Sequence, residues 1–257
     1  MTLIGLAGHP ASNWRLCSHD REGLSVRINA DFSRRASSHD EDASWSASPS
    51  KGVERRMLDR IGDEVARATT IVRFAPGSTF ADHVHGGGEE YFVLEGDFVD
   101  EEGSHKAGTY VRNPPWSRHS PSAPDGALIF VKLNQFATDD RSAVVVDTSQ
   151  FRSSLGDDAP AVASLALHCH GKESVRIEVW QADVAIDHWG HGGLEILVLD
   201  GEFIEAGDSY TRHSWLRLPP SEPFVSRAGK SGVRMLVKSG HLSELIGKDD
   251  QRRKQQI

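Results

Sequence analysis

The second half of this 257-residue chain repeats the first half. Residues 83–119 and 188–224 align without a gap at a constant offset of 105 positions, with twelve identities over 37 positions. The identities include turn residues, for example Gly96 and Gly201. Chance similarity does not usually keep register over so long a stretch. The repeat therefore predicts a duplication, with two units of about 100 residues each.

Each unit consists of short runs of β-branched and aromatic residues, separated by glycine, proline and polar turns. The runs cover residues 68–74, 90–96, 109–115 and 127–133 in the first unit, and 175–182, 194–203, 209–220 and 232–240 in the second. Short runs at such regular spacing are typical of an all-β barrel or sandwich. No segment with helical periodicity exceeds about three turns. Residues 52–64 could form either a helical turn or a strand.

This organisation divides the chain into four segments. Residues 1–50 include a stretch rich in Ser, Asp and Arg, and we expect them to form an arm packed on the first barrel. Residues 51–150 form the first barrel and residues 151–247 the second. Residues 248–257 form a polar tail.

Charge and cysteine content exclude several classes of protein. Acidic residues outnumber basic ones, 37 to 29, which argues against a nucleic-acid partner because such binding needs a basic surface. No apolar run approaches the ~18 residues that span a bilayer, and the N-terminus lacks the basic region of a signal peptide. Cys17 and Cys169 do not make a disulfide framework. We therefore expect a cytoplasmic protein with no membrane partner.

One cluster of residues has the pattern of a metal site. His83 and His85 are two positions apart, so on a strand both side chains point to the same face. Three glycines follow and allow a sharp turn, after which Glu89 can approach the two imidazoles. His119 follows a Pro-Pro turn and adds a third imidazole. Three imidazoles and one carboxylate suit Fe(II), Zn, Mn, Ni or Cu, and leave open positions on an octahedral ion.

The same residues resemble the two motifs of the cupin superfamily. The first motif, G-x5-H-x-H-x3,4-E-x6-G, is matched by Gly77, His83, His85, Glu89 and Gly96. The second motif, G-x5-P-x-G-x2-H-x3-N, is matched by Gly108, Pro114 and His119. The chain departs from it at two positions, with Trp116 in place of glycine and Ala123 in place of asparagine.

The cupin resemblance implies a fold and a ligand set. It implies two tandem double-stranded β-helix (jelly-roll) barrels, which together make a bicupin. It also implies that one divalent metal ion is bound in the first barrel by His83, His85, Glu89 and His119. Fe(II) or Zn is the expected ion, with Mn and Ni as alternatives.

A finer resemblance is to the cupin domain of ChrR-type anti-sigma factors. Residues 52–77, 89–103 and 108–121 carry it, and it covers roughly residues 45–240. In that family the cupin is linked to oxidative-stress sensing, whereas a separate helical domain with an H-x3-C-x2-C pattern captures the sigma factor. The two cysteines of this chain are 152 residues apart. Sigma-factor binding is therefore not carried over.

The second unit has lost most of the ligand set. Its counterparts of His85, Glu89 and His119 are Gly190, Leu194 and Phe224, and only His83 keeps its identity, as His188. We expect a metal-free barrel in which Leu194 and Phe224 fill the former site. A shifted second site remains an alternative, formed by His188, His191 and Glu195.

Several residues around the metal cluster are candidates for function. On a strand, Glu89 and Tyr91 share one face and Glu90 points to the other. Tyr91 and Glu90 are the candidate acid–base residues. The candidate substrate contacts are Trp116, Arg118 and Tyr91.

Two other features have a structural interpretation. Arg112 recurs as Arg217 in the unit that lost its ligands, so we expect an ion pair in place of a substrate contact. We expect His168, Cys169 and His170 to lie at an exposed strand end, because they have no partners at ligand spacing.

Two classes of function fit these observations. Related cupins cleave C–C bonds of β-diketones and hydroxyketones, so the resemblance implies a dioxygenase-like enzyme that uses a non-heme metal and acts on a small oxygenated organic molecule. The alternative is a regulatory protein, a sensor of oxidative stress without catalysis. A non-redox isomerase with Zn or Mn is a third interpretation. We expect a small-molecule substrate or ligand and a homodimer.

Overall fold

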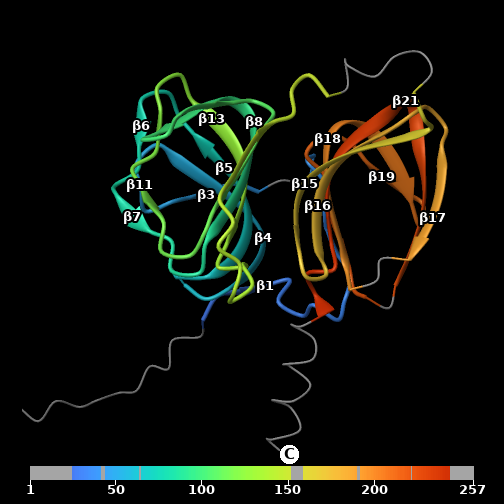
Figure 1. Ribbon diagram of the computed structural model, residues 1–257, viewed down its shortest axis with the longest axis horizontal. Helices are drawn as coiled ribbons and strands as arrows, with labels where there is room; N and C mark the ends of the chain where they lie inside the picture. The colour runs from blue at the N-terminus through green and yellow to red at the C-terminus, as the bar shows by residue number, and fades with distance from the viewer. Residues whose placement is uncertain are drawn as a thin grey trace, which may run out of the picture.

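The computed structural model describes residues 25–41, 44–63, 65–151, 159–189, 192–220 and 222–243, without the side chains of residues 188 and 189. The elements in these residues are strands, which confirms the all-β prediction. They form two major sheets, each of which curls into a barrel (Figure 1). The described part contains no helix long and apolar enough to cross a membrane.

The first barrel contains most strands of the first half of the chain. The order along its sheet is β1 (Arg27–Ile28), β4 (Val53–Ile61), β5 (Arg67–Phe74), β13 (Ala127–Leu133), β8 (Glu89–Asp100), β10 (Thr109–Asn113) and β14 (Val144–Asp147). Four short strands pair beside this path, namely β3 (Ser46–Ala47) with β4, β9 (Gly103–Lys106) with β8, and β12 (Ser122–Ala123) with both β8 and β6 (Ser78–Thr79). A separate pair consists of β7 (His83–Val84) and β11 (Arg118–His119). The ambiguous segment 52–64 is therefore mostly a strand, β4.

The second barrel repeats this arrangement. The order along its sheet is β15 (Val162–His170), β16 (Glu173–Trp180), β21 (Pro223–Ser239), β18 (Leu194–Glu205), β20 (Trp215–Leu218) and β2 (Ala36–Ser38). The strands β17 (Ala185–Trp189) and β19 (Asp208–Tyr210) pair with β21 and β18. The strands β8 and β18 have the same length and start 105 residues apart, as the repeat predicts.

Equivalent glycines keep the central strands of both barrels close together. Gly96 and Gly201 have positive φ angles of 72° and 74°. A Cβ atom there would lie 2.1 Å from the carbonyl oxygen of Gly126 and 2.2 Å from that of Gly232, respectively. Neither position can accept a side chain, because the opposing atom is rigid backbone. This shared restriction explains why the two glycines survive in both units.

The two faces of β8 have different partners. Tyr91 and Val93 pack in the interior of the first barrel. Phe92 and Leu94 belong to a core cluster that also contains residues of the second barrel, such as Ile177. The strand is thus buried on both sides. Its odd-numbered and even-numbered residues face opposite sides of the sheet, which confirms the prediction from alternation.

The interior of the second barrel is apolar where the first barrel has its histidines. Leu194 and Phe224 are 3% and 2% exposed and share one core cluster. The ring of Phe224 also packs against Trp180 and Phe203, with centroids 6.1 and 5.7 Å apart. The predicted filling of the former ligand positions by apolar side chains is therefore confirmed.

The described part of the N-terminal arm packs on the first barrel, as expected, and also contacts the second. The strands β1 and β3 pair with β4, but β2 pairs with β20 of the second barrel. Arg35 anchors this crossing, since its Nη2 lies 2.7 Å from Glu205 Oε1 and its Nε donates to Glu222 Oε1 at 2.7 Å. The short β2 supplies hydrogen bonds that the edge strand β20 would otherwise lack. The sequence of the arm alone does not indicate that β2 would pair with β20.

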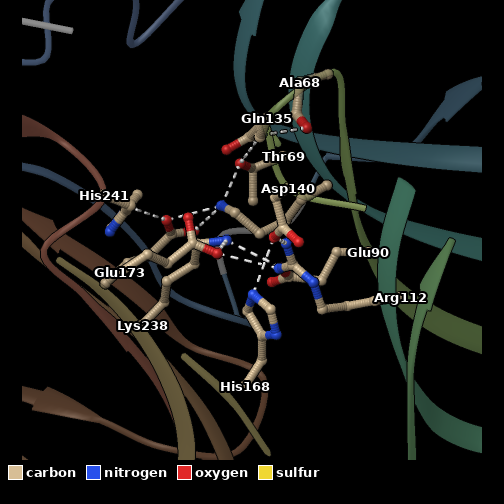
Figure 2. A network of polar contacts seen from close by, with 12 residues as sticks. Ala68, Thr69, Glu90, Arg112, Gln135, Asp140, His168, Glu173, Lys238 and His241 are labelled. Atoms are coloured by element: carbon tan, nitrogen blue, oxygen red, sulfur yellow. Dashed lines mark hydrogen bonds and ion pairs between the residues drawn. The ribbon is translucent and has the colours of Figure 1, made fainter. Parts of the chain in front are cut away.

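Buried charged side chains form a network between the two barrels (Figure 2). Lys238 of the second barrel donates to Glu90 of the first at 2.9 Å, and Lys132 of the first donates to Glu195 of the second at 2.6 Å. Glu90 and Glu195 are equivalent in the repeat, and all four side chains are at most 5% exposed. Each barrel thus gives its lysine to the glutamate of the other, as in an isologous interface between two copies.

Arg112 lies at the centre of this network. Its guanidinium pairs with Glu90, with Asp140 at 2.6 Å and with Glu173 at 3.0 Å. It also stacks on the ring of Phe136 at 3.9 Å. The predicted ion pair is therefore confirmed for Arg112, and its repeat, Arg217, pairs with Asp59 at 2.9 Å.

The histidines of the 168–170 segment do not both lie on the surface, contrary to our expectation. His168 is 8% exposed, and its Nε2 lies 3.0 Å from Asp140 Oδ2. Cys169 is exposed, and His170 pairs with Asp139 at 3.0 Å. The prediction was wrong for His168 because the first barrel covers this end of β15, a contact between distant parts of the chain.

Acid should weaken the contact between the barrels through Asp140. Although burial alone would raise the pKa of this carboxyl, the Ser142 N–H and the charge of Arg112 outweigh it and lower the pKa from 3.8 to about 2. A lowered pKa in the folded state stabilises the protein above the unfolded value, and this contribution is lost as the pH falls from about 4 to about 2. We expect a loss of about 2 kcal/mol from this group in that window, measured by urea unfolding. In Asp140→Asn the same window should show a flatter pH dependence, and an unchanged slope would contradict the assignment.

Candidate metal centre

Two short strands and the start of β8 bring the predicted ligands together. His83 and His119 face each other in the antiparallel pair of β7 and β11. His85 follows β7, and its backbone N–H donates to Ser117 O at 2.9 Å. The glycine turn then leads to Glu89, the first residue of β8. The sequence spacing therefore works as predicted, since the turn allows the chain to reverse between His85 and Glu89.

The four side chains form one compact cluster. One ligand atom from each of His83, His85, Glu89 and His119 lies within 4.8 Å of the others. The Nε2 atoms of His85 and His119 are 3.5 and 3.4 Å from Glu89 Oε2, and the Nε2 atoms of His83 and His85 are 3.1 Å apart. His85, Glu89 and His119 are buried, whereas His83 is partly exposed. The four residues could therefore bind one metal ion.

Each imidazole is held through its other nitrogen. The Nδ1 of His83 lies 2.9 Å from the carbonyl oxygen of Ala81, and that of His85 lies 3.1 Å from Ser117 Oγ. The Nδ1 of His119 lies 3.3 Å from Asp100 Oδ2. These contacts turn all three Nε2 atoms toward the cluster, which is the usual arrangement of metal-ligating histidines.

The polar atoms of the cluster fit a cation. His119 Nε2 is buried and has no hydrogen-bond partner among the described residues, although it faces two other imidazoles and a carboxylate. Burial lowers the pKa of His85, which favours the neutral form that a metal ligand requires. A donor set of this kind suits a divalent transition metal and leaves further positions open.

An apolar cavity adjoins the cluster. Its volume is about 270 Å³, and all four cluster residues line it. The rest of its wall is mainly hydrophobic, with Val53, Val72, Phe74, Phe80, Phe98, Ile129, Val131 and Leu133. Ser48, Arg55 and Asn134 are the other polar side chains of its wall. The cavity can thus hold a small, largely apolar molecule beside the cluster.

The structure does not place the other candidate residues in this cavity. Tyr91 is 1% exposed within the core of the first barrel, next to Phe98, and does not line the cavity. Glu90 points away to the network between the barrels. Trp116 is 74% exposed, and the exposed side chain of Arg118 pairs with Asp82. None of these four side chains lines the cavity, so their functional assignments stay predictions.

Trp116 has the backbone conformation that the cupin motif reserves for glycine. Its φ is +74°, a region that costs a residue with a Cβ about 1–2 kcal/mol. Its N–H donates to His85 O at 2.8 Å, so the turn is fixed regardless of the side chain. We expect Trp116→Gly to stabilise the protein by about 1 kcal/mol in urea unfolding, because the exposed ring contributes little packing. Trp116→Ala keeps the strain and is the control; an equal gain in that variant would contradict strain as the cause.

A shifted site in the second barrel would take its carboxylate ligand from Glu195. His191 and the side chain of His188 lie outside the described residues. Glu195 is engaged elsewhere, since its carboxylate accepts hydrogen bonds from Lys132 and from Trp215 Nε1, the latter at 2.8 Å, and lies 3.1 Å from His241 Nε2. The proposed carboxylate ligand is therefore committed to the contact between the barrels.

Sequence reasoning missed three polar residues next to the ligands. Asp100 and Ser117 hold imidazoles, and Asn113 Nδ2 donates to Glu89 Oε2 at 3.2 Å. Asn113 and Ser117 lie inside the second motif, at positions that the motif leaves free. Asp100 begins an acidic turn that looked like an ordinary loop. Only the folded barrel brings it to His119.

An all-β chain of two barrels, with three histidines and one glutamate gathered in one of them, has the architecture of a bicupin. Residues 33–137 match the model of the ChrR cupin-like domain, so this part of the chain is identified as such a domain. No curated protein sequence is significantly similar to the chain.

Solved structures share the two-barrel fold at low sequence identity. A candidate dioxygenase from Nostoc punctiforme is 14% identical and has a TM-score of 0.65, with 82% of this chain and 84% of that chain covered. The nickel(II) complex of the bacterial pirin YhhW from Escherichia coli is 12% identical with a TM-score of 0.58, covering 80% and 99%. Salicylate 1,2-dioxygenase from Pseudaminobacter salicylatoxidans is 12% identical with a TM-score of 0.54, covering 89% and 90%. These similarities establish the bicupin fold.

Proposed function

We propose that this bicupin is a metal-dependent, dioxygenase-like enzyme that acts on a small oxygenated organic molecule in the first barrel. The convergence of four donor atoms on the wall of an apolar cavity of about 270 Å³ carries the proposal. A divalent ion in this position would supply Lewis-acid activation and, if it is Fe(II), redox activation of O₂. His83, His85, Glu89 and His119 would hold the ion.

The other residues of the cavity would bind and orient the substrate. Its hydrophobic wall would enclose the carbon skeleton and exclude water, while Asn113 and Ser117 keep Glu89 and His85 in place. Neither Tyr91 nor Glu90 lines the cavity. An isomerase would need such a side chain to move a proton, so the cavity favours chemistry that the ion itself activates.

The similar proteins support the proposal in general terms. Two of them are described as a candidate dioxygenase and a salicylate dioxygenase, and the pirin contains nickel(II). At 12–14% identity, the substrates of these proteins are not assigned to this chain. They indicate that oxygen uptake and metal content should be measured first.

Metal analysis of protein purified without oxygen or chelator tests the proposal. We expect one iron per chain and oxygen uptake when β-diketones or hydroxyketones are added. A matched sample of His85→Ala should show neither. One zinc per chain without oxygen uptake would contradict the oxygenase, and two metals per chain would mean that the second barrel also binds an ion.

A sensor is the second candidate, and one observation favours it. Glu89 in the metal cluster and Glu90 in the network between the barrels are consecutive residues of β8. A change at the ion could thus reach the barrel contact directly. For a sensor, removal of the metal should increase hydrogen exchange in β13 and β16 as well as near the cluster. An increase restricted to β7, β11 and the start of β8 would support the enzyme.

A further inference from the structure

Asp100 differs from the other two groups that hold the histidines. His83 and His85 are held by a carbonyl oxygen and a hydroxyl, both uncharged. His119 is held by a carboxylate, at 3.3 Å from its Nδ1. This carboxylate belongs to the same strand as Glu89, since Glu89 is the first residue of β8 and Asp100 the last.

The orientation of Asp100 does not depend on His119. Its other oxygen, Oδ1, lies 3.1 Å from His105 Nε2 and accepts the Glu102 N–H at 3.0 Å. Its side chain is only 5% exposed. The carboxylate is therefore fixed before His119 contacts it, and it can orient the imidazole.

The second barrel uses the equivalent acid differently. Position 205, at the offset of 105, is Glu205, the last residue of β18. The counterpart of His119 there is Phe224, which has no nitrogen to hold. Glu205 instead binds Arg35 of the arm, with Arg35 Nη2 2.7 Å from Oε1. The acid thus contacts an imidazole only in the barrel that has the metal cluster.

We propose that Asp100 is a positioning residue of the metal centre, an inference that rests on the metal binding proposed above. Its carboxylate keeps the proton of His119 on Nδ1, so that the Nε2 lone pair points at the ion. It also places a negative charge on the side of the imidazole that faces away from the ion. This charge makes the Nε2 of His119 a stronger metal ligand. His105 acts behind it by fixing the carboxylate.

Cobalt(II) binding by the full chain tests this inference. Asp100→Asn keeps the shape of the side chain and removes its charge. We expect the Kd for Co(II) to rise roughly 10- to 100-fold, with an altered absorption spectrum of the bound ion. Glu101→Gln is the matched control, because it removes the same charge from the neighbouring residue. The Glu101 carboxylate accepts the Ser120 N–H and does not hold an imidazole. It should change the Kd less than about threefold by comparison.

The protonation of His119 gives a second measurement without metal. At a pH high enough for the imidazole to be neutral, nitrogen-15 chemical shifts of the metal-free protein should show His119 protonated on Nδ1 in the wild type and as a mixture of tautomers in Asp100→Asn. Should that variant fail to fold, the wild-type spectrum alone still decides, because protonation on Nε2 would overturn the inference.

The outcomes separate this inference from the proposed function. Equal weakening by Asp100→Asn and Glu101→Gln would reduce the effect to general charge and overturn the positioning role. Unchanged Co(II) affinity in Asp100→Asn would overturn it as well, while metal binding itself would stand. A wild-type protein that binds no Co(II) would overturn both.

Discussion

Replacing His85 by alanine should deprive the protein of its metal. His85 is buried, and its Nε2 is within 3.5 Å of both His83 Nε2 and Glu89 Oε2, so it occupies the middle of the donor set. Loss of a residue that hydrogen-bonds to a metal ligand already lowers the metal affinity about 10- to 100-fold. Loss of the ligand itself should therefore lower it more than about 100-fold. Metal content after dialysis, together with the Kd for Co(II), measures the effect.

His188→Ala is the matched control for this prediction. His188 is the only residue of the second unit that keeps a ligand identity in the repeat. The second barrel has Leu194 and Phe224 in place of two other ligands, and both are buried in its core. The control should therefore retain its metal. Equal metal loss in the two variants would refute a single site in the first barrel.

Arg112→Met should cause the largest loss of stability among the substitutions considered. The side chain is 1% exposed and pairs with Glu90, Asp140 and Glu173. Removing one partner of a buried ion pair leaves uncompensated charge and costs about 3–5 kcal/mol. Here three carboxylates would lose a cation, so we expect the upper part of that range in the free energy of unfolding from urea titration.

An exposed ion pair provides the comparison for Arg112. Lys230 pairs with Asp183 at 2.9 Å, but its side chain is 87% exposed. Solvent screens such a pair, so Lys230→Met should leave the unfolding midpoint unchanged. A shift for Arg112→Met as small as that for Lys230→Met would show that the buried network does not stabilise the contact between the barrels.

The residues that sequence reasoning placed correctly are those fixed by local rules. Alternation along β8 put Tyr91 and Phe92 on opposite faces, and the His-x-His spacing with its glycine turn brought His83, His85 and Glu89 together. The residue placed wrongly, His168, depends on a distant contact. His168 is buried because Asp140, 28 residues away, binds it.

The all-β class, the duplication and the four candidate ligands could be predicted from the sequence alone. Each of these follows from spacing within a short segment or from a comparison of one half with the other. Tertiary structure alone decided that β2 joins the second barrel, that lysines and glutamates pair across the barrels, and that Asp100 meets His119. The physical reason is that strand pairing and ion pairing join residues that are far apart along the chain. Such partners become neighbours only when hydrophobic burial has brought the barrels together.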